Sequence, residues 1–246
     1  MNTKITLISS RAFHITALNE NALLVSYGNI IDAAINEKII ALHEQLTAAP
    51  FGGMIESVPA YASLAVFYDT LIIKQQQTNI TSAFDFVQQR VLQLISKIEV
   101  QTDIRINTII SIPVYYNGED LNDVACLHGL SVEELIQIHT TATYRVYMTG
   151  FLPGFAYMGT VDERIATARK ELPRLCVPAG SVGIAGAQTG IYPVDSPGGW
   201  QLIGKTPLKI FDQTKKDPCL LKAGDQVKFV SITKTEFEKR NEYQHH

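Results

Sequence analysis

Polar side chains that could hold a small carboxylate or amide gather in one stretch of the chain, residues 147–211. Arginine donates hydrogen bonds in a planar fork that matches a carboxylate. Hydroxyl and amide groups, together with N–H groups left free at turn glycines, can fix a small polar molecule. The sequence identifies no catalytic residue there. The predicted contacts for a substrate or a partner protein are Arg169, Arg174, Ser181, Gln188, Thr189, Tyr192 and Trp200.

The composition of the same stretch predicts short strands joined by shaped loops. It holds ten of the 16 glycines, six of the 10 prolines and the only tryptophan. Glycine gathers where φ is positive or where backbones approach closely, and Pro-Gly and Gly-Gly pairs mark turns. Loops of this kind on a β scaffold commonly bind ligands.

Each candidate also has a purely structural interpretation. Arg169 and Arg174 could be solvated or could pair with Glu163 and Glu171, because surface ion pairs are common and weak. The aromatic residues could pack in a core, and Gln188 with its neighbours could form only a turn. The clustering of these residues is stronger evidence for a site than any single one of them.

Several chemistries are not expected of residues 147–211. No histidine lies between His139 and His245, so a Ser–His or Cys–His nucleophile pair cannot be built within the stretch. The stretch offers one cysteine and four acids, which predicts no metal site. That cysteine, Cys176, stands between Leu175 and Val177 and is predicted to be a buried strand residue.

Two motifs are expected to be accidental matches. Residues 199–206, GWQLIGKT, fit a phosphate-loop pattern, but their bulky residues read as a β-hairpin rather than as a backbone cradle. Residues 120–139 resemble a helix-turn-helix. The second helix carries Glu133 and Glu134 and no lysine or arginine, which favours a structural helical hairpin over DNA binding.

The first hundred residues alternate strands and helices in the order ββαββα. Apolar residues from Ile31 to Leu46 recur at helical spacing, with Asn29 placed to cap the helix and Pro50 to end it. A second helix starts at Thr81 or Ser82. Strands are predicted at residues 13–15, 22–27, 54–58 and 63–68. This order predicts a small α+β sandwich.

The rest of the chain predicts a second domain. Residues 104–115 read as its first strand, followed by helices at 120–127 and 131–139, the second opened by a capping box of Ser131 and Glu134. Strands and loops follow, including strands at 208–211, 219–221 and 227–230. The predicted domains are residues 1–102 and 103–236, with a charged tail at 237–246.

Composition narrows the functional classes. A net charge of −3 and a pI near 6.1 argue against a basic surface that would bind nucleic acid or an anionic membrane. No run of about eighteen apolar residues or signal-like segment is present. Three separate cysteines without a CxxC pair favour reduced thiols. We expect a cytoplasmic protein.

Three blocks of the glycine-rich stretch carry a resemblance to a known family. They read GFLPGFAYMG (150–159), LPRLCVPAGSVGIAGAQTGIYP (172–193) and SPGGWQLIGKTPLKIFD (196–212). They resemble the B subunits of 5-oxoprolinase (PxpB), a group also called allophanate hydrolase subunit 1 or KipI, an inhibitor of a sporulation histidine kinase. Where the family usually has Thr-Pro-Arg-Arg, this chain has Thr-Ala-Arg-Lys at 167–170, so the second basic group is a point charge rather than a fork.

The resemblance implies both a fold and an activity. The fold is a small N-terminal α+β domain followed by a cyclophilin-like β-barrel. The activity is the ATP-driven opening of 5-oxoproline to glutamate by a complex with a KipA/PxpC-type subunit and a PxpA-like subunit. ATP is then used by the assembled complex and is not expected to bind this chain alone. The alternative is a KipI-like protein that binds a sensor histidine kinase. Prolyl isomerase activity is the least favoured, because the barrel segment after His139 has no histidine before the terminal pair His245 and His246.

Overall fold

The computed structural model describes residues 4–6, 13–77, 80–100 and 109–242. The chain divides into two compact units, Met1–Ile106 and Asn107–His246. The boundary predicted near residue 102, and the first part of the strand predicted at 104–115, lie outside the described residues.

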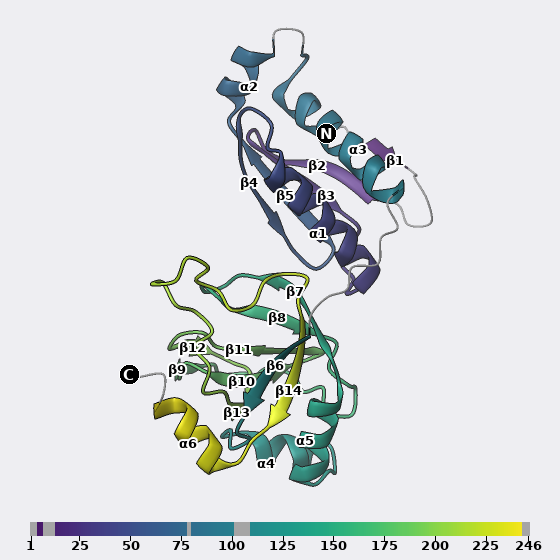
Figure 1. The fold of residues 1–246 in the computed structure, drawn as a ribbon. Helices are drawn as coiled ribbons and strands as arrows, with labels where there is room; N and C mark the ends of the chain where they lie inside the picture. Colours follow the sequence, from purple (N-terminus) through teal and green to yellow (C-terminus); the bar gives the residue numbers. More distant parts are fainter. Residues whose placement is uncertain (1–3, 7–12, 78–79, 101–108, 243–246) are drawn as a thin grey trace. The chain divides into compact units, whose positions relative to one another are not determined.

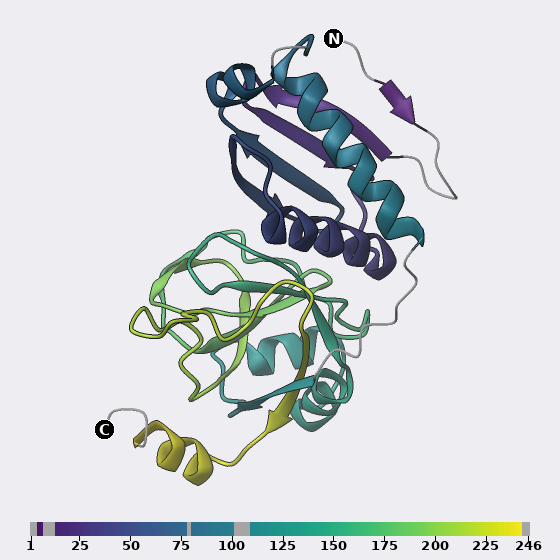
Figure 2. The ribbon, with the colours of Figure 1, turned by 45° about the horizontal axis from the view of Figure 1, so that its top comes forward.

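The first unit is a five-stranded antiparallel sheet with helices packed on it (Figure 1). The strand order is β1-β2-β3-β5-β4. Helices α1 and α3 lie alongside the sheet (Figure 2). Their apolar residues share one core with alternate residues of β2, β3 and β5. The α+β class is therefore confirmed. The elements are β1 (Lys4–Thr6), β2 (Phe13–Asn19), β3 (Ala22–Ser26), α1 (Ala33–Ala48), β4 (Met54–Pro59), β5 (Ser63–Tyr68), α2 (Thr70–Gln76) and α3 (Ala83–Val100).

Two details of this unit differ from the sequence prediction. The cap of α1 is Asp32, whose carboxylate accepts a hydrogen bond from the Ile35 N–H at 3.0 Å, so Asn29 is not the cap and Ile31 lies outside the helix. Helix α2 was not predicted. Its seven residues are too few to show a period, and its signal is the Asp69 carboxylate, which accepts from the N–H groups of Leu71 and Ile72.

The second unit is a nearly closed barrel of seven strands in the order β13-β10-β11-β8-β7-β14-β6. Tyr115 and Lys205 exchange backbone hydrogen bonds, both 2.9 Å, and thereby join the two end strands. The predicted barrel is confirmed. Its strands are β6 (Ile109–Val114), β7 (Tyr144–Thr149), β8 (Ala156–Gly159), β10 (Ser181–Ala185), β11 (Gln188–Ile191), β13 (Gln201–Lys205) and β14 (Gln226–Ser231).

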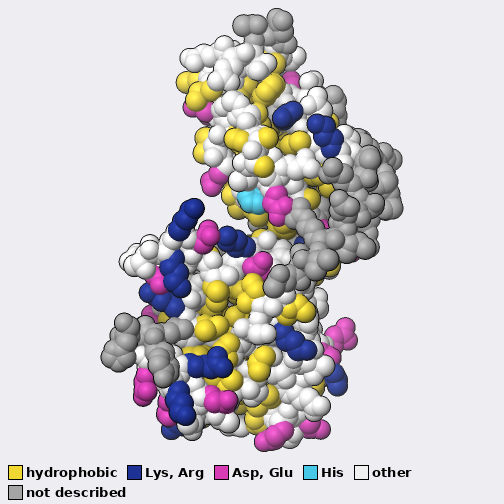
Figure 3. All heavy atoms as spheres, viewed as in Figure 1, with side chains coloured by type: hydrophobic (Ala, Val, Ile, Leu, Met, Phe, Trp, Pro, Cys, Tyr) yellow, Lys and Arg dark blue, Asp and Glu magenta, His cyan; other side chains and the backbone are white. Residues whose placement is uncertain are grey.

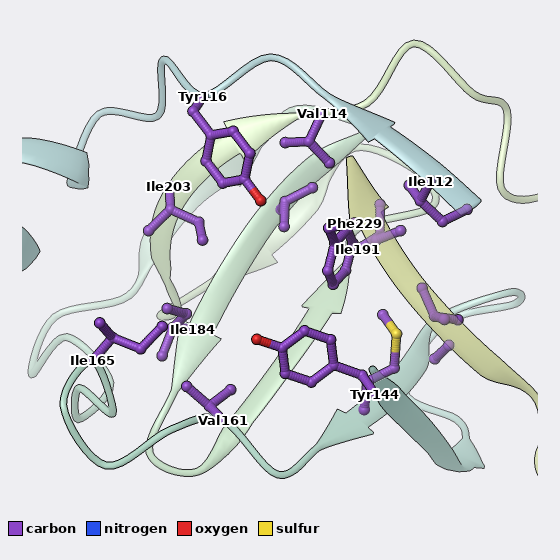
Figure 4. Close-up of a cluster of buried hydrophobic side chains, with 14 of the residues drawn as sticks. Ile112, Val114, Tyr116, Tyr144, Val161, Ile165, Ile184, Ile191, Ile203 and Phe229 are labelled. Atoms are coloured by element: carbon purple, nitrogen blue, oxygen red, sulfur yellow. The ribbon is translucent and has the colours of Figure 1, made fainter. Parts of the chain in front are cut away.

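The barrel interior is filled by side chains. Figure 4 shows the rings of Tyr116 and Tyr144 pointing inward among Ile184, Ile191 and Phe229. A two-stranded ribbon of β9 (Arg174–Val177) and β12 (Ser196–Gly198) lies outside the seven-stranded sheet. The helices of this unit are α4 (Leu121–Leu127), α5 (Val132–Thr141) and α6 (Lys234–Glu242).

The predicted helices of this unit are confirmed, whereas two predicted strands are wrong. The capping box of α5 forms, with Ser131 N donating to Glu134 Oε2 at 2.8 Å and Glu134 N donating to Ser131 Oγ at 3.1 Å. Residues 208–211 and 219–221 form only an isolated bridge between Phe211 and Cys219, since prolines at 207 and 218 remove backbone donors there. The charged end contains helix α6.

The surface carries mixed charges. On the face of the second unit drawn in Figure 3, lysine and arginine side chains are interspersed with acidic and hydrophobic ones. Among the described residues no helix is long and apolar enough to cross a lipid bilayer.

Candidate functional site

Four aromatic rings pack together at one side of the barrel, and we call them the aromatic cluster: Phe155, Tyr157, Tyr192 and Trp200. Ring centroids lie 5.4 Å apart for Phe155 and Trp200, 5.9 Å for Tyr157 and Trp200, and 6.4 Å for Tyr192 and Trp200. Edge-on contacts of this kind are favourable and rigid. Phe155, Tyr192 and Trp200 are buried and Tyr157 is half-buried, so Tyr157 is the ring of the cluster that reaches the surface.

Two glycines explain why the cluster needs a glycine-rich sequence. A Cβ atom on Gly190 would lie 3.0 Å from both the Trp200 ring and the Ala156 carbonyl oxygen. A Cβ atom on Gly198 would overlap the Tyr192 ring and hydroxyl. The close approach of β11 and β12 to the rings therefore requires residues without side chains.

Arg169 lies over the aromatic cluster. Its guanidinium carbon is 5.9 Å from the centre of the Trp200 ring, within the range of a cation–π contact. The side chain is exposed, and none of the described residues supplies a carboxylate to it. Burial raises the pKa of Tyr157 while the charge of Arg169 opposes that rise, so the hydroxyl stays protonated at neutral pH. The exposed groups are thus a cation and a phenol.

A buried carboxylate holds the segment that carries Arg169. Asp120, whose side chain is 3% exposed, accepts hydrogen bonds from Lys170 Nζ, Arg174 Nη2 and the Leu202 N–H, each at 2.7 Å. Burial alone would raise the pKa of Asp120, but these donors outweigh it and hold the pKa below its usual value. Lys170 N also donates to the Gly199 carbonyl at 2.7 Å. We call Asp120, Lys170 and Arg174 the Asp120 clamp.

Arg174 is fully engaged within the chain. Its guanidinium donates to Glu119 at 3.0 Å, to both oxygens of Asp120 at 2.7 Å and to the Trp200 carbonyl at 3.3 Å. The acids predicted as alternative partners, Glu163 and Glu171, are not those partners. The sequence predicted that the Arg174 guanidinium binds a ligand. In the structure this group instead holds the backbone of Trp200 in position.

The remaining predicted residues, Ser181, Thr189 and Gln188, do not share one environment. Ser181 is buried and donates to the Pro178 carbonyl at 2.7 Å. Thr189 is fully buried inside the barrel, where its hydroxyl donates to the Gly183 carbonyl at 3.0 Å. Gln188 is half-buried on β11 opposite Gly159. The fold thus brings Arg169, Arg174, Tyr192 and Trp200 together and turns Ser181 and Thr189 away.

The fold also brings a histidine into the barrel from outside the glycine-rich stretch. His139 of α5 is fully buried and lies 2.7 Å from the Tyr116 hydroxyl through Nδ1 and 3.1 Å from Thr189 Oγ1 through Nε2. Because Thr189 donates its own proton to Gly183, His139 must donate from Nε2 and accept at Nδ1. The helical spacing of Leu135 and His139 was the available signal that His139 lies on the buried face.

We expect acid to destabilise the barrel through His139. Burial lowers its pKa to about 3, against 6.5 when exposed. Below pH 6.5 the unfolded chain binds a proton that the folded one does not, so the free energy of unfolding falls as pH drops, by at most about 1.4 kcal/mol per pH unit. Urea titrations between pH 7.5 and 5 measure this slope. His139→Gln should flatten it, and equal slopes in both proteins would contradict the assignment.

Apolar side chains border the site and are open to solvent. Phe151, Leu172 and Leu175 are 63%, 86% and 92% exposed. Phe151 has a φ of 70°, a conformation that costs a bulky residue energy, and its ring contacts Phe155 edge-on at 5.7 Å. Cys176 is exposed, so its predicted burial is wrong: β9 has only β12 as a neighbour. We call Phe151, Leu172 and Leu175 the apolar rim.

The described residues contain no group of three or more histidine, cysteine, aspartate or glutamate side chains placed to hold a metal ion. The arrangement is one of recognition: an exposed guanidinium and phenol on a rigid aromatic support, bordered by the apolar rim. Such a surface can bind a small carboxylate whose remaining atoms are apolar or amide-like.

Comparisons with known proteins agree over nearly the whole chain. Residues 13–221 match the family model of the carboxyltransferase domain, subdomains C and D. The chain is 45% identical over 230 residues to the 5-oxoprolinase B subunit of Bacillus subtilis (strain 168), covering 92% of this chain and 95% of that protein. It is 40% identical to the 5-oxoprolinase B subunit of Haemophilus influenzae, covering 88% of this chain and 97% of that protein.

A solved structure shares the fold. The protein TTHA0988 superposes with a TM-score of 0.73 at 36% identity over 86% of this chain. The present chain spans 40% of the length of TTHA0988. The chain therefore belongs to the family of the carboxyltransferase domain, subdomains C and D, that includes the B subunits of 5-oxoprolinase.

Proposed function

We propose that this chain is the B subunit of an ATP-dependent 5-oxoprolinase and that it is active only within a complex. In the overall reaction 5-oxoproline and water give glutamate, while ATP and a second water molecule give ADP and phosphate. The near full-length identity to proteins named as B subunits of 5-oxoprolinase supports the assignment.

The observation that carries the proposal is the exposed Arg169 over Trp200. In this proposal the guanidinium binds the carboxylate of 5-oxoproline in a bidentate pair. The Tyr157 hydroxyl lies on the same cluster and donates to a polar group of the lactam, and the ring carbons of the substrate pack on the rim. These residues bind and orient the substrate, a contribution that lowers the barrier by positioning.

The partners in the proposal are a KipA/PxpC-type subunit and a PxpA-like subunit. The apolar rim supports an interface, because exposed apolar groups beside a site are typical of protein contacts. The length of TTHA0988 beyond the matched region also supports association with further polypeptide. ATP is assigned to the complex rather than to this chain, whose GxxxxGKT match lies largely in strand β13 (Gln201–Lys205) and is not followed by a helix.

The test is glutamate release from 5-oxoproline and ATP by this chain alone, by the two partners alone, and by the mixture. We expect activity only in the mixture. Activity of the partners alone at the full rate would remove the role of this chain. If no complex forms and the chain instead lowers the autophosphorylation of a sensor histidine kinase, the alternative inhibitor function replaces the proposed one.

A further inference from the structure

The N-terminal unit contains a hollow of about 310 Å³ between α3, the end of α2 and the loop that precedes β4. Its volume is at the lower end of the roughly 300–1,000 Å³ typical of small-molecule sites. The lining residues used below are Phe51, Gly52, Phe86, Gln89, Arg90 and Gln93. None of them belongs to the barrel unit.

The spacing of the α3 residues explains how they come together. Phe86, Gln89, Arg90 and Gln93 stand at i, i+3, i+4 and i+7, which places them on one face of the helix. The core residues Val87, Val91 and Leu94 lie on a different face and are buried. The hollow is therefore lined by a face of α3 beside its fully buried residues, and Phe51 and Phe86 also pack against the edge of that core.

Two phenylalanines form the apolar part of the hollow. The rings of Phe51 and Phe86 meet edge-to-face with centroids 5.9 Å apart and an angle of 80°. The loop that carries Phe51 is closely packed: a side chain on Gly52 would collide with the side chain of Gln76 at the end of α2. The Phe51 carbonyl also accepts from Met54 N at 2.9 Å. Both rings are half-buried, so each keeps an accessible part.

The polar part of the hollow consists of one guanidinium, which donates, and of amide side chains, which both donate and accept. Within the part of the chain that the structure describes, no ion pair joins Arg90 to a carboxylate. Gln89 and Gln93 are exposed at the mouth of the hollow. Arg90 is half-buried beside the phenylalanine pair. A guanidinium next to apolar rings favours an anion of planar shape, and amide side chains pair with amide or carbonyl groups.

We propose that this hollow is a ligand site for a small carboxylate that also carries an amide or carbonyl group. Arg90 binds the carboxylate, Gln89 and Gln93 bind the amide or carbonyl, and the carbon skeleton packs on Phe51 and Phe86. The site is separate from the one around Arg169 and does not depend on the reaction proposed above.

The test uses the full chain without partners and two probes. 5-Oxoproline has the carboxylate and the amide, and 2-pyrrolidinone is the same ring without the carboxylate. We expect 5-oxoproline to shift the backbone amide resonances of Gly52 and Gly53 saturably in ¹H–¹⁵N NMR spectra, and 2-pyrrolidinone to bind at least tenfold more weakly. Arg90→Gln should weaken 5-oxoproline binding there about tenfold or more, whereas the matched control Arg169→Gln should leave it unchanged.

The outcomes separate the two sites. Shifts confined to the barrel unit around Gly190 and Trp200, with none at Gly52, would overturn this inference and leave the proposed function standing. Equal binding of both probes at Gly52, or unchanged binding in Arg90→Gln, would remove the role of Arg90 and overturn the inference. Shifts at Gly52 that persist in Arg169→Gln and vanish in Arg90→Gln would support it.

Discussion

Replacing Asp120 with alanine should lower the free energy of unfolding of the barrel unit by about 3 kcal/mol. Removing one partner of a buried ion pair leaves the others uncompensated, which typically costs about 3–5 kcal/mol. The lower value applies because the Lys170 side chain is 32% exposed, so water can solvate its charge once Asp120 is removed. The Arg174 side chain is only 17% exposed and carries most of the expected loss. Urea unfolding followed by fluorescence measures the loss, since Trp200 is the only tryptophan and reports on this unit.

The matched control is Asp162→Ala. Asp162 also pairs with an arginine, Arg164, at 2.8 Å, but that pair is exposed and its two partners are only two residues apart in the sequence. Solvation replaces such a pair with little loss, so we expect no resolvable change. Asp120→Asn should lie between the two variants, because it keeps a hydrogen-bonding side chain without its charge. A loss in Asp120→Ala no larger than in the control would mean that the Asp120 clamp contributes nothing to stability.

Replacing Arg169 with glutamine should lower kcat/KM for 5-oxoproline in the assembled complex by about 100-fold. A charged hydrogen bond to a substrate contributes about 2–4 kcal/mol in transition-state terms, and each 1.4 kcal/mol is a factor of ten. Arg169 contacts the Trp200 ring rather than a carboxylate of the described chain, so stability should change far less than activity. Steady-state glutamate release and the unfolding midpoint measure the two effects.

Two further variants isolate the role of the planar fork. Arg169→Lys keeps the charge but not the bidentate geometry and should retain an intermediate activity. Arg164→Gln removes a neighbouring exposed arginine that already pairs with Asp162, and it should leave kcat/KM within threefold. If Arg169→Gln were also within threefold, the carboxylate would be bound elsewhere, and the proposed binding role of Arg169 would be wrong.

Local patterns in the sequence predict local structure well in this protein. The capping box at Ser131 and Glu134 forms because both partners stand three residues apart, and no distant contact is needed to bring them together. The strand character of residues 201–205 is visible because bulky residues fill what would be a phosphate cradle. The glycine-rich stretch predicts close packing of the backbone. In the structure Gly190 and Gly198 allow this close approach to the rings of the aromatic cluster.

Contacts between distant residues are what the sequence could not supply. Arg174 and Asp120 are separated by 54 residues, and no local pattern joins them, so Glu163 and Glu171 were the natural alternatives. The same limit applies to His139, which meets Thr189 across 50 residues. Cys176 has apolar neighbours in the sequence, but its strand belongs to a two-stranded ribbon, and the number of neighbouring strands is a property of the whole fold.

The pairing of β6 with β14, the first and last strands of the barrel along the chain, has a consequence for how the chain folds during synthesis. β6 opens the barrel unit, yet Ile109 to Val114 pair with Gln226 to Ser231 of β14, near the end of the chain. A ribosome must therefore have released almost the whole unit before this parallel ladder can form, and contacts of such long sequence separation form slowly. In the N-terminal unit β2 pairs with β3, and β4 with β5, each directly along the chain. We expect that unit to fold while the barrel is still being synthesised.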